Sequence, residues 1–256
     1  MTGLKVSIIT ICYNSAATIR ESIESVLAQD YTNIEYTIVD GQSTDATCDI
    51  VRSYGDAINV FKSESDTGIY NAMNKGIALA TGDVVAFLNS DDVYRDCTVV
   101  GRMADLMQRD HLDAAYGDIY YVDRANIQRV IRYWRTGEFG EGAIGRGWIP
   151  PHPSFFCRRD VYMRLGTYNE EFRIAADYEL MLRYIAVHRV RIGYLPYVVV
   201  NMRVGGESHR LKGFLKGNRE ILRSFQTNKL PLPRFFIVRR MMAKLKQFLV
   251  RERVGT

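Results

Sequence analysis

Short apolar runs alternate with amphipathic stretches through the first 90 residues. The apolar runs are rich in β-branched side chains, which predicts strands covered on both faces. They lie at residues 6–12, 34–39, 58–61 and 84–88. The stretches between them carry apolar side chains at helical spacing and predict helices at residues 14–29, 45–54 and 69–80. This alternation predicts an α/β fold with a mostly parallel central sheet flanked by helices, whose ligands bind beyond the carboxyl ends of the strands.

After residue 92 the pattern is less regular. It predicts helices at residues 97–109, 159–165 and 176–187 and extended segments at residues 114–122 and 191–202. Five glycines within residues 137–147 predict a mobile loop. Residues 211–253 mix apolar with basic side chains, and Pro231 and Pro233 divide them, so we expect two helices joined by a bend.

The positive charge of the chain is concentrated at its C-terminal end. Residues 203–256 contain 14 Lys and Arg against 3 Asp and Glu, whereas residues 1–202 contain 20 against 26. The acidic body argues against broad contact with a nucleic-acid backbone. The basic amphipathic tail favours peripheral contact with an anionic membrane surface, and the alternative is a helical pair that packs its apolar side on the body.

The N-terminal sequence lacks the features of a signal peptide, because the apolar run at residues 6–12 is short and no small-residue cleavage site follows it. No apolar stretch approaches the roughly 20 residues that span a bilayer. We therefore expect a cytoplasmic protein. The cysteines, at positions 12, 48, 97 and 157, have no CxxC spacing, so we expect reduced packing residues rather than a disulfide framework or a zinc site.

Polar side chains follow nearly every predicted strand of the first half. Asn89, Ser90, Asp91 and Asp92 come directly after an apolar strand, and adjacent carboxylates there are costly unless a cation or a donor-rich ligand neutralises them. Hard oxygen ligands suit Mg²⁺ or Mn²⁺ completed by substrate phosphates. The alternative is that Asp92 or Asp96 caps the next helix.

Two further strand ends suit a nucleotide. Asp40 precedes a flexible glycine, and Ser43 lies in the same turn before a helix, which suits hydrogen bonds to a base or ribose; the alternative is a plain capped turn. Asp66, Asn74 and Lys75 surround the start of an otherwise apolar helix, although Lys75 could instead be solvated.

The chain resembles the family 2 glycosyltransferases, which have the GT-A fold. The matching segments are VSIITICYN, VDGQSTDAT, SDTGIYNAMNKGIALATGD, FLNSDD, HPSFFCRRDVY and AADYELMLR. They occur in the family's order over about residues 5–210, and the likeness is strongest to bacterial enzymes of cell-envelope polysaccharide and glycolipid assembly. The resemblance implies a donor-binding half at residues 1–125, an acceptor-binding and catalytic-base half at residues 126–210, and a basic helical tail at residues 211–256.

The resemblance also assigns roles to single positions. Asp40 is expected to bind the base, Asp91 the ribose or sugar, and Asp92 the metal, which neutralises the departing diphosphate. Because this chain has Ser-Asp-Asp in place of a literal Asp-x-Asp, either carboxylate can hold the metal. The remaining donor-binding positions are Thr10, Tyr13, Asn14, Ser43, Asp66, Asn74, Lys75, Asn89 and Ser90.

An inverting transfer needs a base for the acceptor hydroxyl, and the resemblance implies Asp177, with Glu179 as the fallback. On residue chemistry alone Asp177 could merely cap its helix. His152 follows the glycine-rich stretch and is expected to touch the acceptor or diphosphate, or else to be a turn residue. His209 is expected to reach the metal or diphosphate, or else to be an exposed loop residue.

These features predict an inverting, metal-dependent transfer of a sugar from a nucleotide-diphosphate sugar to a lipid-linked or glycan acceptor. An NAD-dependent dehydrogenase is rejected because no glycine follows the first strand, where GxGxxG belongs. A nucleotidyltransferase is disfavoured because this sequence has no early glycine-rich loop that could bind the triphosphate. A non-catalytic nucleotide- or membrane-binding module leaves the acidic strand ends unexplained.

Overall fold

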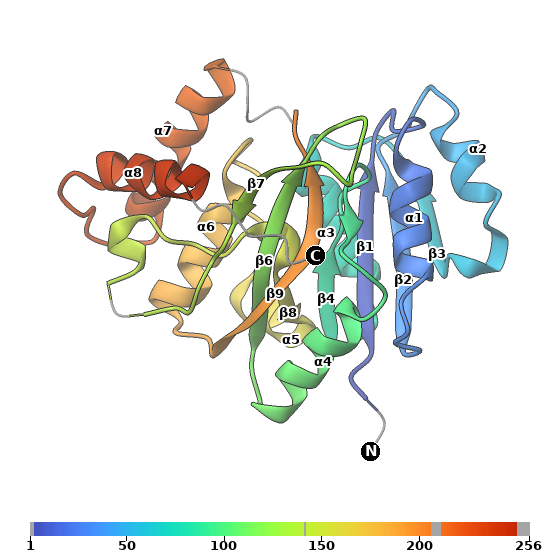
Figure 1. The fold of residues 1–256 in the computed structure, drawn as a ribbon, viewed down its shortest axis with the longest axis horizontal. Coiled ribbons are helices and arrows are strands. Elements are labelled where there is room, and N and C mark those ends of the chain that lie inside the picture. Colours follow the sequence, from blue (N-terminus) through green and yellow to red (C-terminus); the bar gives the residue numbers. More distant parts are fainter. Residues whose placement is uncertain (1–2, 141, 206–210, 250–256) are drawn as a thin grey trace.

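The computed structural model describes residues 3–140, 142–205 and 211–249, and within these residues nine strands form one sheet (Figure 1). The strand order is β3-β2-β1-β4-β8-β6-β9-β5, with β7 paired to β6. The strands are β1 (Val6–Cys12), β2 (Ile34–Asp40), β3 (Val60–Ser63), β4 (Val84–Phe87), β5 (Val93–Tyr94), β6 (Ala114–Val122), β7 (Val130–Trp134), β8 (Phe156–Arg158) and β9 (Ile192–Arg203). The α-helices are α1 (Ile19–Leu27), α2 (Thr47–Arg52), α3 (Ile69–Leu79), α4 (Val99–Arg109), α5 (Arg159–Leu165), α6 (Ala176–Leu182), α7 (Leu211–Thr227) and α8 (Phe236–Leu249).

The first four strands are parallel, as the alternating pattern predicts. β1 pairs with both β2 and β4, and β2 pairs with β3. The second predicted helix is shorter than expected because it stops at Arg52 and Gly55 takes a positive φ of 54°, which glycine adopts without steric cost. The third strand consequently begins at Val60, two residues later than predicted.

The second half of the sheet is mixed. β4 pairs antiparallel with β8, and β8 with β6, whereas β6 and β9 are parallel. The sequence pattern did not reveal β5, β7 or β8, since the first and last of these have only two and three residues and β7 is a largely exposed edge strand. The predicted helix at residues 176–187 corresponds to α6 followed by a π-helical segment, Arg183–Val187.

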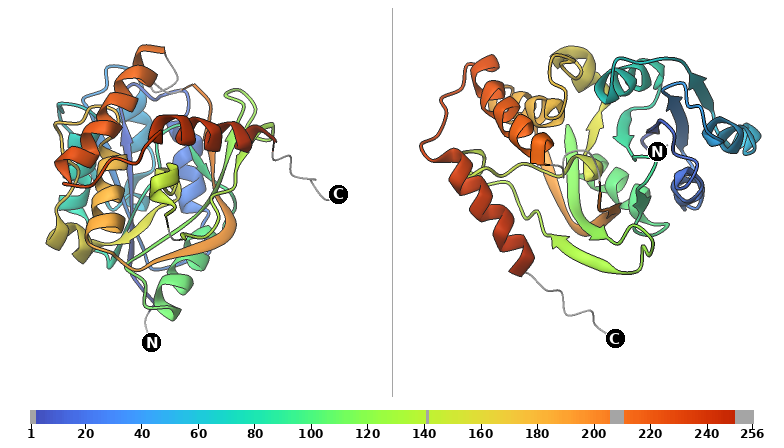
Figure 2. Two further views of the ribbon diagram at one scale, coloured as in Figure 1. Left: turned by 90° about the vertical axis from the view of Figure 1, so that its left-hand side faces the viewer. Right: turned by 90° about the horizontal axis from the view of Figure 1, so that it is seen from above.

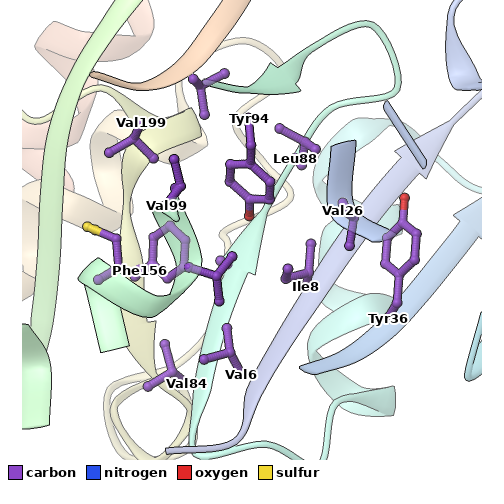
Figure 3. Close-up of a cluster of buried hydrophobic side chains, with 14 of the residues drawn as sticks. Val6, Ile8, Val26, Tyr36, Val84, Leu88, Tyr94, Val99, Phe156 and Val199 are labelled. Atoms are coloured by element: carbon purple, nitrogen blue, oxygen red, sulfur yellow. The ribbon is translucent and has the colours of Figure 1, made fainter. Parts of the chain in front are cut away.

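Helices cover both faces of the sheet because alternate residues of the central strands point to opposite sides. Val6 and Ile8 pack with α1 and α4 on one face, and Figure 3 shows part of this cluster. Ile9 and Ile11 pack with α3, α5 and α6 on the other face. All four side chains are buried, which confirms that β1 is covered on both sides.

The two C-terminal helices pack on α6 at the end of the molecule opposite α2 (Figures 1 and 2). Ile221, Phe225 and Phe236 are buried there against Tyr178 and Leu182. The prediction of two helices separated by the prolines is therefore confirmed, and part of their apolar surface does pack on the body. Among the described residues, no helix is long and apolar enough to cross a membrane.

The cysteines are unpaired thiols, as expected from their spacing. Cys12 and Cys157 are buried, and Cys48 is half-buried beside Asp40. The expectation that all four are packing residues is wrong for Cys97, which is exposed just before the start of α4.

A buried acid, Glu35, ties three segments together at the amino ends of the strands. Its carboxylate accepts hydrogen bonds from Lys5 Nζ at 2.8 Å, Ser7 Oγ at 2.5 Å and the Thr81 amide at 2.8 Å. Burial opposes the ionisation of Glu35, but these donors outweigh it and lower its pKa to about 2.

We predict that Glu35→Gln lowers the free energy of unfolding at pH 7 by about 1–3 kcal/mol, because an amide leaves buried donors unsatisfied. The folded pKa lies below the unfolded value of 4.5, so the stabilisation by ionised Glu35 is present above pH 4.5 and is lost as pH falls toward 2. Urea unfolding of both proteins should therefore show a stability difference that shrinks across this window. Asp49→Asn, which alters an exposed ion pair, is the control, and an equal difference at both ends of the window would contradict the prediction.

Candidate functional site

The carboxyl ends of β1, β2, β3 and β4 meet at one edge of the sheet, because these strands are parallel and in contact. Cys12, the last residue of β1, is in register with Asp40, the last of β2, which is in register with Ser63, the last of β3. The loop after β3 also reaches this edge: a Cβ built on Gly41 would lie 2.5 Å from Asp66 Oδ2. Gly41 thus permits the two loops to touch.

Asp40 is fully buried at the end of β2 and is held as a carboxylate. It accepts hydrogen bonds from Ser43 N at 2.9 Å, Ser43 Oγ at 2.5 Å, Ser63 Oγ at 2.7 Å and Cys48 Sγ at 3.2 Å. Burial opposes ionisation, but these donors hold the pKa of Asp40 below its ordinary value. Asp40 and Ser43 therefore form one unit, and much of their bonding capacity serves the turn itself.

The turn after β1 is exposed and is built by Asn14. Asn14 has a φ of 48°, a conformation that Asn tolerates better than most residues, and its Oδ1 accepts from the Thr44 amide at 2.8 Å. The backbone N–H of Asn14 donates to Ser43 Oγ at 2.8 Å. This arrangement presents Tyr13 to solvent, and the residue is 63% exposed. By contrast Thr10 is fully buried, with its hydroxyl 3.0 Å from that of Tyr36, so it does not reach the edge.

Asp91 and Asp92 follow β4 at the same edge. Asp92 is buried and accepts from Asn89 Nδ2 at 2.9 Å and from the Arg203 amide at 3.1 Å, whereas Asp91 is half-buried. Burial and the neighbouring charge of Asp91 raise the pKa of Asp92 despite its two donors. Asp92 does not cap α4, which begins seven residues later at Val99. Ser90 Oγ lies 2.9 Å from Ser15 Oγ, linking this turn to the turn after β1.

Arg203, the last residue of β9, is a site residue that the sequence analysis missed. Its buried guanidinium donates to the Asp91 carbonyl at 2.5 Å and to Glu21 Oε2 at 2.6 Å, while its amide binds Asp92. The available signal was its position directly after a long extended run, which is the same rule that singled out Asp40. Arg203 joins β9 and α1 to the two carboxylates.

The residues around the start of α3 have partners within the protein. Asp66 Oδ1 accepts from the Gly68 amide at 2.8 Å. Lys75 Nζ pairs with Glu64 at 2.9 Å and donates to the Ser65 carbonyl at 2.7 Å, so it organises the loop before α3 rather than being simply solvated. Asn74 Nδ2 bonds the Tyr168 carbonyl at 2.9 Å, so Asn74 connects α3 to the second half of the chain.

Asp177 lies in the first turn of α6, next to α3. Its Oδ1 is 3.1 Å from the hydroxyl of Tyr70, which also bonds the Ile174 carbonyl at 2.8 Å. The Asp177 side chain makes no cap hydrogen bond to α6, so the alternative interpretation as a helix cap is not what the structure shows. Because Tyr70 is two residues after Gly68, Asp177 sits beside the loop that carries Asp66.

The other acceptor candidates differ in exposure. His152 is half-buried, with Nε2 2.6 Å from the Tyr168 hydroxyl, and burial lowers its pKa against the opposing charge of Asp177. Glu179 is 2% exposed, and its Oε1 accepts from Arg183 at 3.0 Å and Asn228 at 3.0 Å. This burial removes Glu179 from any open surface, so we retain it neither as the fallback base nor as a residue that contacts the acceptor. His209 lies outside the described residues.

The edge therefore combines a carboxylate pair, a separate buried carboxylate and an exposed aromatic ring with an aspartate on a neighbouring helix. No cluster of three or more His, Cys, Asp or Glu side chains suited to a metal is found among the described residues. A cation here would have to rely on the Asp91 and Asp92 oxygens and on ligands from a substrate, which is the usual arrangement for Mg²⁺ with phosphates.

Known proteins resemble the chain in sequence. The family model "Glycosyl transferase family 2" matches residues 7–166. A PGL/p-HBAD biosynthesis glycosyltransferase of Mycobacterium tuberculosis is 30% identical over 217 residues, which cover 82% of this chain and 82% of that protein. An uncharacterised glycosyltransferase of Nostoc sp. is 36% identical over 191 residues, covering 68% of this chain and 57% of that one.

Solved structures resemble it in fold. TarS 1-349 of S. aureus in complex with UDP-GlcNAc superimposes with a TM-score of 0.70 at 21% identity, covering 96% of this chain and 72% of that one. The mannosyltransferase PcManGT of Pyrobaculum calidifontis, in complex with GDP-Man and Mn²⁺, gives a TM-score of 0.66 at 19% identity, with 96% and 74% covered. These likenesses confirm the GT-A fold. With the family match over residues 7–166, they establish that this chain belongs to glycosyl transferase family 2 and is a glycosyltransferase.

Proposed function

We propose that this glycosyltransferase moves a sugar, with inversion at the anomeric carbon, from a nucleotide-diphosphate sugar to a hydroxyl of a lipid-linked or glycan acceptor of the cell envelope. The observation that carries the proposal is the meeting of Asp40, Asp66, Asp91 and Asp92 at one edge of the sheet, with Asp177 on the adjoining helix. Acidic side chains gathered at strand ends suit a ligand that brings donors and a cation with it.

The donor nucleoside binds, in this proposal, between the turns after β1 and β2. Tyr13 offers an exposed ring for a base, and the turn around Asp40 and Ser43 offers polar atoms to the base or ribose. Asp66 lies against Gly41 on the same side. UDP-GlcNAc and GDP-Man in the two structural neighbours support a nucleotide-sugar donor.

A divalent cation, Mn²⁺ or Mg²⁺, fits the carboxylates at the end of β4. The buried position of Asp92 beside Asp91 raises its pKa, and a positive charge nearby would favour its ionised form. The bound metal would supply charge neutralisation for the departing diphosphate. Asn89 and Arg203 hold the pair in place by their hydrogen bonds, and Mn²⁺ in PcManGT supports the choice of ion.

Asp177 acts as the general base. It removes the proton from the acceptor hydroxyl as that oxygen bonds to the anomeric carbon and the bond to the diphosphate breaks. The Tyr70 hydroxyl, shared between Asp177 and the Ile174 carbonyl, orients the carboxylate. The half-buried His152, paired with the buried Tyr168, lies beside this segment and shapes the acceptor side.

The acceptor is proposed to be presented at the inner face of an anionic membrane. PGL/p-HBAD biosynthesis in the mycobacterial relatives supports an envelope glycolipid or polysaccharide. The outer side of α8 and the turn before it is apolar, exposing Leu232, Phe235, Val238, Met241 and Met242. Exposed Arg234 and Arg239 border this apolar stripe, and residues 229–256 contain eight basic residues and one acidic one. Such a surface suits anionic headgroups, and each basic residue near the membrane contributes about 1 kcal/mol to the free energy of binding.

We predict that nucleotide-sugar hydrolysis without acceptor requires Mn²⁺ or Mg²⁺ and releases one nucleoside diphosphate preferentially. Asp91→Asn and Asp92→Asn should each lower the rate by about 10²- to 10³-fold, because charge at the leaving diphosphate is no longer neutralised. Measurement of nucleoside diphosphate release over a donor panel checks this. Asp105→Asn, an exposed aspartate on α4, is the matched control, and full activity in chelator would contradict metal dependence.

A second prediction concerns the base. Asp177→Asn keeps the shape of the side chain but cannot take a proton, so transfer should fall by about 10²- to 10⁴-fold. Binding of UDP with Mn²⁺, measured by calorimetry, should be unchanged. The control is Asp160→Asn on α5, which removes an exposed charge. Near wild-type transfer by Asp177→Asn would assign the base to another residue.

A third prediction concerns the apolar stripe. The full chain should sediment with phosphatidylglycerol vesicles at low salt and be released by high salt, since the contact is partly electrostatic. Arg234→Glu with Arg239→Glu should weaken binding about tenfold or more, and Phe235→Ser with Val238→Ser should also weaken it. Arg109→Glu with Arg164→Glu, at exposed basic positions elsewhere, controls for net charge. Equal binding to neutral phosphatidylcholine vesicles would overturn the electrostatic contact.

A further inference from the structure

The backbone that leads into α6 is held by an acid from another helix. Three consecutive amides, those of Arg173, Ile174 and Ala175, donate to the carboxylate of Glu220 on α7 at 3.2, 2.8 and 2.9 Å. Glu220 is 8% exposed. These amides belong to the segment just before α6, which begins at Ala176, so Glu220 supplies hydrogen-bond partners to the backbone that leads into the helix.

The same short segment carries Asp177. The Tyr70 hydroxyl contacts it from α3, through the Ile174 carbonyl and Asp177 Oδ1, and Glu220 contacts it from α7. Residues 173–177 are therefore clamped between two helices. A shift of Glu220 would move the backbone two residues before Asp177 and change where its carboxylate points.

The helix that supplies Glu220 is itself fixed against α6. Phe225 of α7 packs against Tyr178 with ring centroids 6.5 Å apart, and Phe236 packs on Phe225 at 4.9 Å. Arg240 of α8 lies over the Tyr178 ring at 5.9 Å and bonds Asn218 at 2.8 Å, two residues before Glu220. The two C-terminal helices thus form one rigid support for the start of α6.

We propose that Glu220 is a positioning residue for the general base, so that the C-terminal helices set the geometry of catalysis as well as packing on the body. The inference rests on the proposed role of Asp177. The Glu220 carboxylate can accept all three backbone hydrogen bonds at once. A glutamine side chain accepts only with its oxygen and places its NH₂ group against one of the amides.

The test compares Glu220→Gln and Glu220→Ala with wild type in hydrolysis of UDP-GlcNAc or GDP-mannose, whichever the enzyme accepts, with Mn²⁺. A base displaced by a fraction of an ångström to 1 Å should lower kcat by about 10- to 100-fold, with Ala more severe than Gln. The KM for the donor and the Kd for UDP should stay within about twofold of wild type, because donor contacts are made by other elements. Glu171→Gln, which removes the exposed acid paired with Arg223, is the matched control.

The double variant Asp177→Asn with Glu220→Gln separates positioning from general stability. If Glu220 acts through Asp177, the double variant should be no slower than Asp177→Asn alone. Additive loss, or an equal fall in kcat and in UDP affinity, would overturn the inference, and so would wild-type kcat in Glu220→Gln. If Asp177→Asn itself retains wild-type activity, the proposed base fails instead. Thermal melting checks that each variant is folded. If Glu220→Ala does not fold, the comparison of Glu220→Gln with wild type is the test.

Discussion

Asp92 places a carboxylate in the interior shortly after β4, and the surrounding elements supply hydrogen bonds that offset the free-energy cost of burying it. A buried acid without partners would be strongly unfavourable. Asn89 and the Arg203 amide donate to it, and the Arg203 guanidinium ties the adjacent Asp91 carbonyl to Glu21 of α1. The pair of acids is therefore correctly placed only when β4, β9 and α1 have come together, which couples the candidate metal site to the completion of the sheet.

The second requirement is the alignment of the parallel strands. Their register brings Asp40 level with the end of β1, and the missing side chain at Gly41 lets the loop of Asp66 approach. Hydrogen bonds such as those from Ser43 to Asp40 keep this carboxylate ionised and oriented before a ligand arrives. Preorganised polar groups of this kind do not have to reorient during reaction, which is how they favour catalysis.

The C-terminal helices have two different sides. Their inner side buries Ile221, Phe225 and Phe236 on α6, while the outer side of α8 leaves an apolar stripe beside basic residues exposed. The membrane interpretation and the packing interpretation of this segment therefore concern different faces and are compatible. In the proposed function, the helix that faces the membrane, α8, also packs on Tyr178 of α6 and holds α7, which supplies Glu220.

Much of the donor side could be predicted from local patterns. The residues of a buried strand are apolar on both faces, so the position where such a run stops is visible, and Asp40, Asp66, Asp91 and Asp92 were all found in this way. Thr10 was assigned to the nucleotide from the family resemblance, but the pleat turns its side chain into the core beside Tyr36. Glu179 shows the same limit on α6, where the packing of α7 buries it.

The sequence by itself determined the alternation of strands and helices, the acidic strand ends and the two C-terminal helices, because each depends on residues close together in the chain. Tertiary structure alone decided the antiparallel strands β5, β7 and β8, the role of Arg203 and the contact of Glu220 with the backbone that leads into α6. Arg203 lies more than 100 residues from Asp91, and Glu220 lies about 45 residues from the amides it binds. Such contacts form between residues that no local periodicity relates, so only the folded chain brings them together.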